Sequence, residues 1–335
     1  MYGIAGLILL LGLTVAFATS VGSVRIPVGE VWRTVFSFFA GLRANLPEPL
    51  ATIILDIRLP RILLTALVGA ALAVAGATYQ GLFRNPLADP YLIGVSQGAG
   101  LGATIGFLLP LPVTFPILGI VPVLAFAGAF LSAGSVYFLA RRGRTVSLTT
   151  LILAGVAIGA FLAAVTSYLL LTAGEKLPGI IFWLMGGFSL SHWREFLLVL
   201  PYVLVGSAVI FLYSQPLNVL QLGDEQAQQL GVNVERVKLI LLLAATLVTA
   251  AAVSFVGTIG FVGIIVPHGA RLIWGPDHRF LIPLSALAGA SFLILADTFA
   301  RSVLGPVEVP VGVVTAFCGA PFFLYLLRSR KWVAL

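Results

Sequence analysis

The chain has 335 residues, of which 60% are hydrophobic and only 9% are charged. Soluble proteins carry about a quarter charged residues, so this composition excludes a soluble enzyme, a nucleic-acid-binding domain and a disordered chain. The formal net charge of +7 is interpreted as loop charge, because Lys and Arg in short loops orient membrane spans. We therefore expect an all-α polytopic membrane protein embedded in a lipid bilayer.

Long apolar runs alternate with short loops that contain Pro, Gly or charge, and this pattern predicts about ten membrane-spanning helices. The expected spans are 4–20, 62–82, 94–109, 115–140, 148–171, 195–213, 237–254, 258–273, 280–299 and 310–327. An even number of spans places both termini on one side of the membrane. The basic cluster Arg141, Arg142 and Arg144 assigns that side to the cytoplasm.

Some residues within the spans carry structural expectations. Gly98 and Gly102 lie four residues apart, a spacing that lets helix backbones approach closely. Asp297 and Arg301 are also four apart and can pair on one helix face. The single cysteine, Cys318, lies in an apolar run and is interpreted as a small packing residue.

Several kinds of chemistry are missing from the sequence. It contains no G-x-x-x-x-G-K-[ST] phosphate-binding loop, no H-E-x-x-H motif and no Cys–His cluster. We therefore assign no catalytic residue, metal ligand or cofactor to this chain, and energy for uphill transport has to come from a partner. An ion-coupled secondary transporter is an alternative, but it usually needs a mid-span carboxylate that this sequence does not supply.

The longest polar stretch is 216–238, which the spans place in the cytoplasm. Asp224 can cap a short helix with Glu225 in its first turn, and Gly231 suits the residue after the helix end. A second short helix is expected to follow through Glu235, Arg236 and Lys238. The segment therefore predicts a small rigid knob, with a solvated loop as the alternative.

Several blocks of the sequence resemble those of a known family. Glu225-Gln-Ala227 followed by Gly231 has the spacing of the E-A-A-x-x-x-G coupling motif of ABC importer permeases. Further blocks resemble the FecCD family, the permeases for iron-siderophores, haem and cobalamin. These blocks are Arg58-Leu-Pro-Arg61, Asn85 to Pro90 with Leu92 to Gly100, Gly260 to His268, Asp277-His-Arg279, and Val309 to Pro321.

The resemblance implies that residues 1–335 form a single importer transmembrane domain in the bacterial plasma membrane. It implies two permease subunits, here a homodimer, together with two cytoplasmic ATPases that bind ATP and Mg²⁺ and an external substrate-binding protein. Pairing with a homologous permease is the alternative to the homodimer. A membrane scaffold without transport is disfavoured by the knob together with Arg58, Arg61 and Arg301, which the expected topology places on the external side.

The resemblance also implies site residues. The contact with the ATPases is expected at Asp224, Glu225, Ala227, Leu230, Gly231 and Val232. Arg58, Arg61 and Arg301 match family positions that face outward and meet acidic residues of the binding protein, with snorkelling at the membrane interface as the alternative for Arg58 and Arg61. Ser147, Thr149 and Thr150 match the cytoplasmic gate region, with ordinary helix capping as the alternative.

The cargo expected from the resemblance is a metal chelate. An iron-siderophore or haem is favoured because most of the family serves iron, and cobalamin is the alternative. Specificity is expected to lie in the separate binding protein, so this sequence carries little of it.

Overall fold

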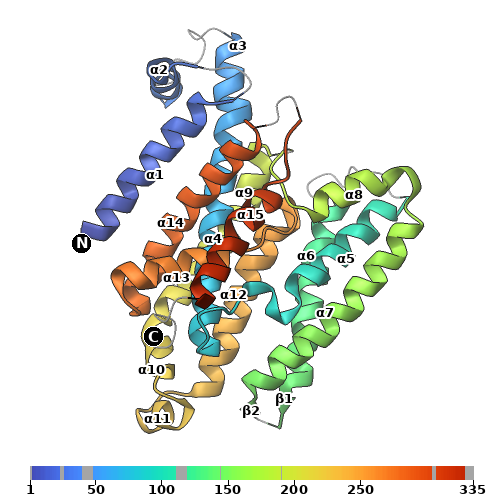
Figure 1. Ribbon diagram of the computed structural model, residues 1–335, viewed down its shortest axis with the longest axis vertical. Coiled ribbons are helices and arrows are strands. Elements are labelled where there is room, and N and C mark those ends of the chain that lie inside the picture. Colours follow the sequence, from blue (N-terminus) through green and yellow to red (C-terminus); the bar gives the residue numbers. More distant parts are fainter. Residues whose placement is uncertain are drawn as a thin grey trace.

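The computed structural model describes residues 2–22, 26–39, 48–110, 119–143, 145–189, 191–303 and 307–328, and it is almost entirely helical (Figure 1). In chain order the elements are α1 (Tyr2–Ser20), α2 (Val28–Phe39), α3 (Glu48–Ala51), a π-helical segment (Thr52–Arg58), α4 (Leu59–Phe83), a 3₁₀ turn (Pro90–Ile93), α5 (Val95–Leu108), α6 (Ile120–Ala140), β1 (Arg141–Arg142), β2 (Thr145–Val146), α7 (Leu148–Leu171), a 3₁₀ turn (Gly174–Lys176), α8 (Leu177–Leu184), α9 (Trp193–Leu212), α10 (Ser214–Leu220), α11 (Asp224–Gln229), α12 (Val234–Val256), α13 (Val262–Trp274), α14 (His278–Ala300) and α15 (Val311–Arg328).

Each predicted span has a helix, in the order α1, α4, α5, α6, α7, α9, α12, α13, α14 and α15, which confirms the all-α membrane fold. Within the described residues, seven helical stretches are individually long and apolar enough to cross a membrane. The helices α5, α13 and α15 are shorter or less apolar than this. The 13 residues of α13 extend only about 20 Å at 1.5 Å per residue, less than the roughly 30 Å hydrocarbon core. The structure therefore supports a helix at each of the ten expected spans, but over the residues that it describes only seven of these are long and apolar enough to count as complete crossings.

Helix α4 runs through the centre of the molecule, and 78% of its most apolar window, in the stretch Pro49–Phe83, is buried (Figure 1). Glycines let neighbouring backbones come close to it: Gly69 lies against Gly289 of α14, and Gly76 lies against Gly263 of α13. A methyl group at Gly76 would overlap the Gly263 carbonyl. Small residues at such crossings are what membrane helices use in place of a hydrophobic driving force.

The helices α5, α6 and α7 form a second group on the far side of α12 (Figure 1). The predicted close packing through glycines is confirmed here, because Gly98 lies against Gly128 of α6 and Gly102 lies against the Leu124 backbone. Ser132 of α6 also donates a hydrogen bond to the Gly94 carbonyl at 2.8 Å.

A non-helical turn joins α12 to α13 inside the bundle. Gly257 and Phe261 both have positive φ, at 75° and 70°. The Tyr91 hydroxyl donates to the Ile259 carbonyl at 3.0 Å and accepts from the Ile259 N–H at 3.2 Å. Thr258 Oγ1 donates to the Leu184 carbonyl at 2.5 Å. Irregular backbone is tolerated at membrane depth when other parts of the protein satisfy it in this way.

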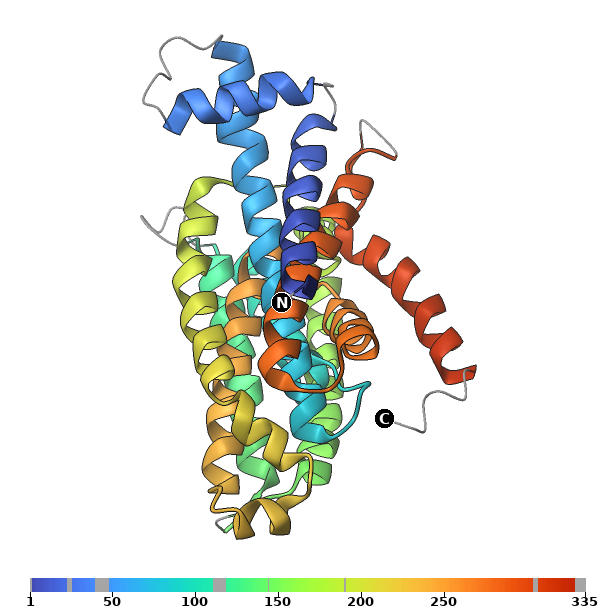
Figure 2. The ribbon, with the colours of Figure 1, turned by 90° about the vertical axis from the view of Figure 1, so that its left-hand side faces the viewer.

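Two features lie at the periphery of the fold. The amphipathic helix α2 lies across the end of the molecule, with Val31 buried and Trp32 exposed (Figure 2). Cys318 is exposed on α15, so the prediction that it packs within its own chain is wrong. The reason is that α15 diverges from the bundle (Figure 2), so that its apolar run is not enclosed by its own chain.

Candidate functional site

The predicted knob is present at one end of the molecule, where α10 and α11 follow each other at the bottom of Figure 1. Gly231 follows the end of α11 with φ +83°. Its N–H bonds the Gln228 carbonyl at 2.9 Å, and the Val232 N–H bonds the Ala227 carbonyl at 3.0 Å. These two bonds make a Schellman motif, which closes a helix with a left-handed residue. The predicted helix end at Gly231 is therefore confirmed.

Two details of the predicted knob are wrong. Gly223, and not Asp224, precedes the first turn of α11, so the Asp224 carboxylate does not cap the helix. The second short helix, α10, comes before α11, while Glu235 and Lys238 belong to the first turns of α12. The physical reason is that the Asn233 side chain accepts from the Arg236 N–H at 3.1 Å, which starts the long helix directly after the knob.

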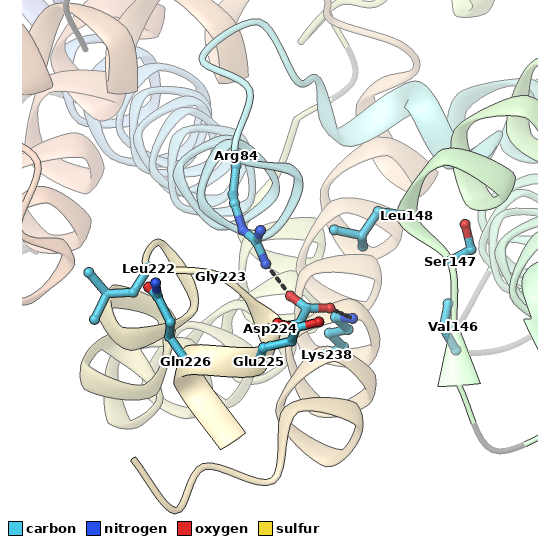
Figure 3. Close-up of a pocket in the computed structure, with 10 residues that line it drawn as sticks. All are labelled: Arg84, Val146, Ser147, Leu148, Leu222, Gly223, Asp224, Glu225, Gln226 and Lys238. Atoms are coloured by element: carbon cyan, nitrogen blue, oxygen red, sulfur yellow. Dashed lines mark hydrogen bonds and ion pairs between the residues drawn. The ribbon is translucent and has the colours of Figure 1, made fainter. Parts of the chain in front are cut away.

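The Asp224 carboxylate instead joins an ion cluster of four side chains, Arg84, Asp224, Lys238 and Glu235. Figure 3 shows Asp224 between Arg84 and Lys238. Arg84 ends α4 with φ +50°, and its guanidinium pairs with Asp224. Lys238 Nζ lies 2.5 Å from Asp224 and 3.2 Å from Glu235, and its side chain is only 3% exposed. Burial alone would raise the pKa of Asp224, but Lys238 and Arg84 together hold it below its usual value.

Hydrogen bonds also attach α10 to two spans. Gln221 Nε2 donates to the Gly81 carbonyl of α4 at 2.8 Å. Asn218 Nδ2 donates to Asp277 at 2.7 Å, and Asn218 Oδ1 accepts from the His278 N–H at 2.9 Å, where α14 begins. The hydrogen bond from Arg279 holds the pKa of Asp277 well below its usual value. The knob is therefore fixed to the ends of α4 and α14.

Of the predicted gate residues, Ser147 lies across a cavity from the knob. The cavity has a volume of about 550 Å³ and is lined by Asp224 and Glu225 on one side and by Ser147 and Leu148 on the other (Figure 3). Ser147 caps α7 by accepting from the Thr150 N–H at 3.3 Å. Thr149 is exposed. The geometry thus gives Ser147 the capping role of the alternative interpretation and brings it close to α11.

The three predicted docking arginines come together at the opposite end of the molecule, in an arginine cluster of Arg58, Arg61, Asp297, Arg301 and Glu308. Arg58 Nη1 donates to the Thr19 carbonyl at 2.5 Å, and Arg301 donates to the Ala18 carbonyl. Both therefore bind the last carbonyls of α1, where the helix dipole favours a cation. Arg58 is 5% exposed, so its role in the fold is largely internal.

Arg61 is the main partner of both carboxylates in this cluster. It forms a two-point contact with Asp297, with Nε–Oδ2 at 3.0 Å and Nη2–Oδ1 at 2.8 Å, and it reaches Glu308 at 2.9 Å. Ser189 Oγ donates to Glu308 at 2.8 Å. The predicted Asp297–Arg301 pair is present only at 3.9 Å. Although burial alone would raise the pKa of Glu308, its Arg61 contacts hold that pKa below its usual value.

Sequence reasoning missed most partners in both clusters. The Arg84–Asp224 pair joins residues 140 positions apart, and Arg61–Asp297 joins residues 236 positions apart. The local signals were the spacing of Glu235 and Lys238, three residues apart on a helix, and that of Asp297 and Arg301, four residues apart.

The chain is similar to known proteins over nearly its whole length. The model of the FecCD transport family matches residues 8–329. The cobalamin import system permease protein BtuC of Halobacterium salinarum is 50% identical over 299 residues, which cover 89% of this chain and 79% of that protein. The hemin transport system permease protein HmuU of Yersinia pestis is 43% identical over 286 residues, covering 83% and 84% of the two chains.

A solved structure gives the same result. A metal-chelate type ABC transporter in an inward-facing conformation has a TM-score of 0.84 and 33% identity, and it covers 97% of this chain and 98% of its own. The family match spans far more than half of the sequence, and the relatives are permeases of ABC importers. The chain therefore belongs to the FecCD transport family, as a multi-pass permease subunit of an ABC importer in the plasma (inner) membrane.

Proposed function

We propose that the chain moves a metal chelate inward by alternating access, with energy from ATP hydrolysis in two cytoplasmic partner subunits. An external binding protein delivers the chelate, and ATP and Mg²⁺ bind to the ATPases, so the chain itself uses no cofactor. The observation that carries this proposal is the attachment of α10 and α11 to the ends of α4, α12 and α14. A segment bonded to three spans moves them when the ATPases move it.

The proposed contact with the ATPases consists of Asp224, Glu225, Ala227, Leu230, Gly231 and Val232. Within it the side chains divide the work. Leu230 is 64% exposed and Glu225 is exposed, so these two are available to a partner groove. Ala227 is fully buried and Asp224 is paired, so these two hold α11 in place.

Docking of the binding protein is proposed at the arginine cluster as a whole. Arg58, Arg61 and Arg301 already have partners within the chain, so a docking protein meets an organised network and not free guanidinium groups. Glu308 is 36% exposed and Arg61 is 13% exposed, which makes their pair the accessible edge. Charge at such an edge mainly sets orientation and encounter rate.

The pore is proposed to form between two copies of the chain, with the cytoplasmic constriction at Ser147, Thr149 and Thr150. The position of Ser147 across the cavity from α11 supports this, because the constriction then lies next to the element that the ATPases move. The exposed aromatic residues Phe317 and Tyr325 of α15, 76% and 71% exposed, give an apolar face that a second copy can cover.

Cobalamin is the cargo that we place first within the metal-chelate class. The relative with 50% identity is named as a cobalamin permease, whereas the hemin and iron-citrate permeases are 43% and 40% identical. An iron chelate, which the sequence alone favoured, is the second candidate. The hemin and iron-citrate permeases that support it are less identical to this chain, but they still match 83% of it.

The test is uptake into proteoliposomes that contain the permease, its ATPases and its binding protein. Uptake of radiolabelled cobalamin, haem and ferric citrate is measured in the presence of ATP. The matched control replaces ATP by a non-hydrolysable analogue. ATP-dependent uptake of one chelate supports the proposal and names the cargo. Uptake that does not depend on ATP and is lost when an ion gradient is dissipated refutes the proposal in favour of a secondary transporter.

A further inference from the structure

The ion cluster continues into the segment that leads to α7. Glu235 Oε1 lies 3.2 Å from Lys238 Nζ, and its other oxygen, Oε2, accepts from the Val146 N–H at 2.8 Å. Val146 is the last residue of β2 and directly precedes Ser147, the cap of α7. Glu235 is therefore bonded through one oxygen to the ion cluster and through the other to the start of α7.

The cavity makes this connection important. Asp224 of α11 and Ser147 of α7 line opposite sides of it, so open space lies between the two elements (Figure 3). Side-chain packing cannot transmit a displacement across open space. The route through Asp224, Lys238 and Glu235 to the Val146 N–H is made of charged contacts of 2.5, 3.2 and 2.8 Å. Bonds of this charge-assisted type are directional and strong.

We propose that Glu235 is a positioning residue that makes the start of α7 follow the movement of α11. This inference rests on the proposed coupling function and assigns a route within it. Lys238 is buried and cannot leave its two carboxylates without a large desolvation penalty, so it moves with them. Glu235 in turn holds the backbone of Val146, which brings the residues at the proposed constriction along.

The experiment uses the assembled transporter in nanodiscs and measures hydrogen exchange with and without ATP trapping, together with transport per ATP hydrolysed. We expect peptides over 224–232 and 141–150 to respond together in the wild type. In Glu235→Ala the 224–232 peptides still respond, the 141–150 peptides do not, and transport per ATP falls by about tenfold or more, as expected for the loss of the charged contacts with Val146 and Lys238. Glu175→Ala, an exposed carboxylate beyond the other end of α7, is the matched control and leaves every readout unchanged.

Glu235→Gln provides a second variant, because its amide oxygen still accepts from Val146 while its charge contact with Lys238 is lost. We expect the response of 141–150 to be kept in part and transport per ATP to lie between that of the wild type and Glu235→Ala. If Glu235→Ala does not assemble, the test rests on Glu235→Gln. Wild-type exchange of 141–150 and wild-type transport per ATP in Glu235→Gln then overturn the inference.

The outcomes separate the inference from the proposed function. A wild type in which no peptide responds to ATP contradicts the coupling function itself. A wild type in which 224–232 responds and 141–150 does not overturns only the role of Glu235. The same holds if Glu235→Ala responds as the wild type does in both peptides.

Discussion

Replacement of Gly231 tests the knob through a single backbone angle. Gly231 has φ +83°, and a Cβ at this position would meet nothing within 4 Å. A substitution there consequently costs conformational energy without a steric clash inside the chain. For an ordinary L-residue the left-handed conformation costs about 1–2 kcal/mol, more for a β-branched side chain, whereas Asn tolerates it. We therefore predict that Asn disturbs the end of α11 least, Ala more and Val most.

The magnitude follows from the size of α11. The helix has six residues, and the bonds from Gly231 and Val232 hold its last turn. A loss of about 1–2 kcal/mol lowers the ratio of closed to frayed ends by roughly 5- to 30-fold, which is large for a helix this short. The spans are unaffected, because the open surroundings of Gly231 include no span residue within 4 Å.

The assay compares ATPase binding and transport per ATP for Gly231→Asn, Gly231→Ala and Gly231→Val in the reconstituted importer, with membrane insertion as the control. We expect Asn to remain near wild type and Val to uncouple hydrolysis from transport. If Asn and Val are equally damaging, the position acts through contact with the ATPase and not through its backbone angle. Full transport by Gly231→Val refutes the proposal that the knob couples ATP hydrolysis to transport.

Three more predictions follow from the arginine cluster, from Asn218 and from the ion cluster. Arg61→Gln leaves the 3%-exposed Asp297 without its two-point partner and should lower stability in detergent by about 3–5 kcal/mol, while the exposed Arg33→Gln should not; equal melting temperatures would contradict this. Asn218→Leu removes the bonds to Asp277 and His278 and should reduce transport per ATP without loss of ATPase binding, a result that a pull-down and an uptake assay check together. Because the pKa of Asp224 is lowered, its ion pairs are fully present above the ordinary value near 4 and are lost only as the pH falls through the lowered value. The contribution of these pairs to transport per ATP, measured as the difference between the wild type and Asp224→Asn, should therefore be constant from pH 8 to 5, and its loss near pH 6 would contradict this assignment.

The sequence predicts local features well because each of them depends on neighbouring residues. Apolar runs locate the helices, and Gly231 marks a helix end with the correct sign of φ. The boundary after it was wrong because Asn233 starts α12 at once, where an independent short helix was expected. The partners of Asp224 and Arg61 could not be predicted, since they lie 140 and 236 residues away and depend on how α4 crosses the bundle.

The two clusters are connected by one helix. Arg58 directly precedes α4, Arg61 lies in its first turn and Arg84 directly follows it. The 25 residues from Leu59 to Phe83 extend about 38 Å at 1.5 Å per residue. Both Arg61 and Arg84 hold carboxylates from elsewhere in the chain, Asp297 of α14 and Asp224 of α11. A partner that docks at either end therefore acts on the same buried helix. Since α4 is packed on α13 and α14 through glycine contacts without room for side chains, and also lies against α12, a shift of α4 has to be shared by the helices around it.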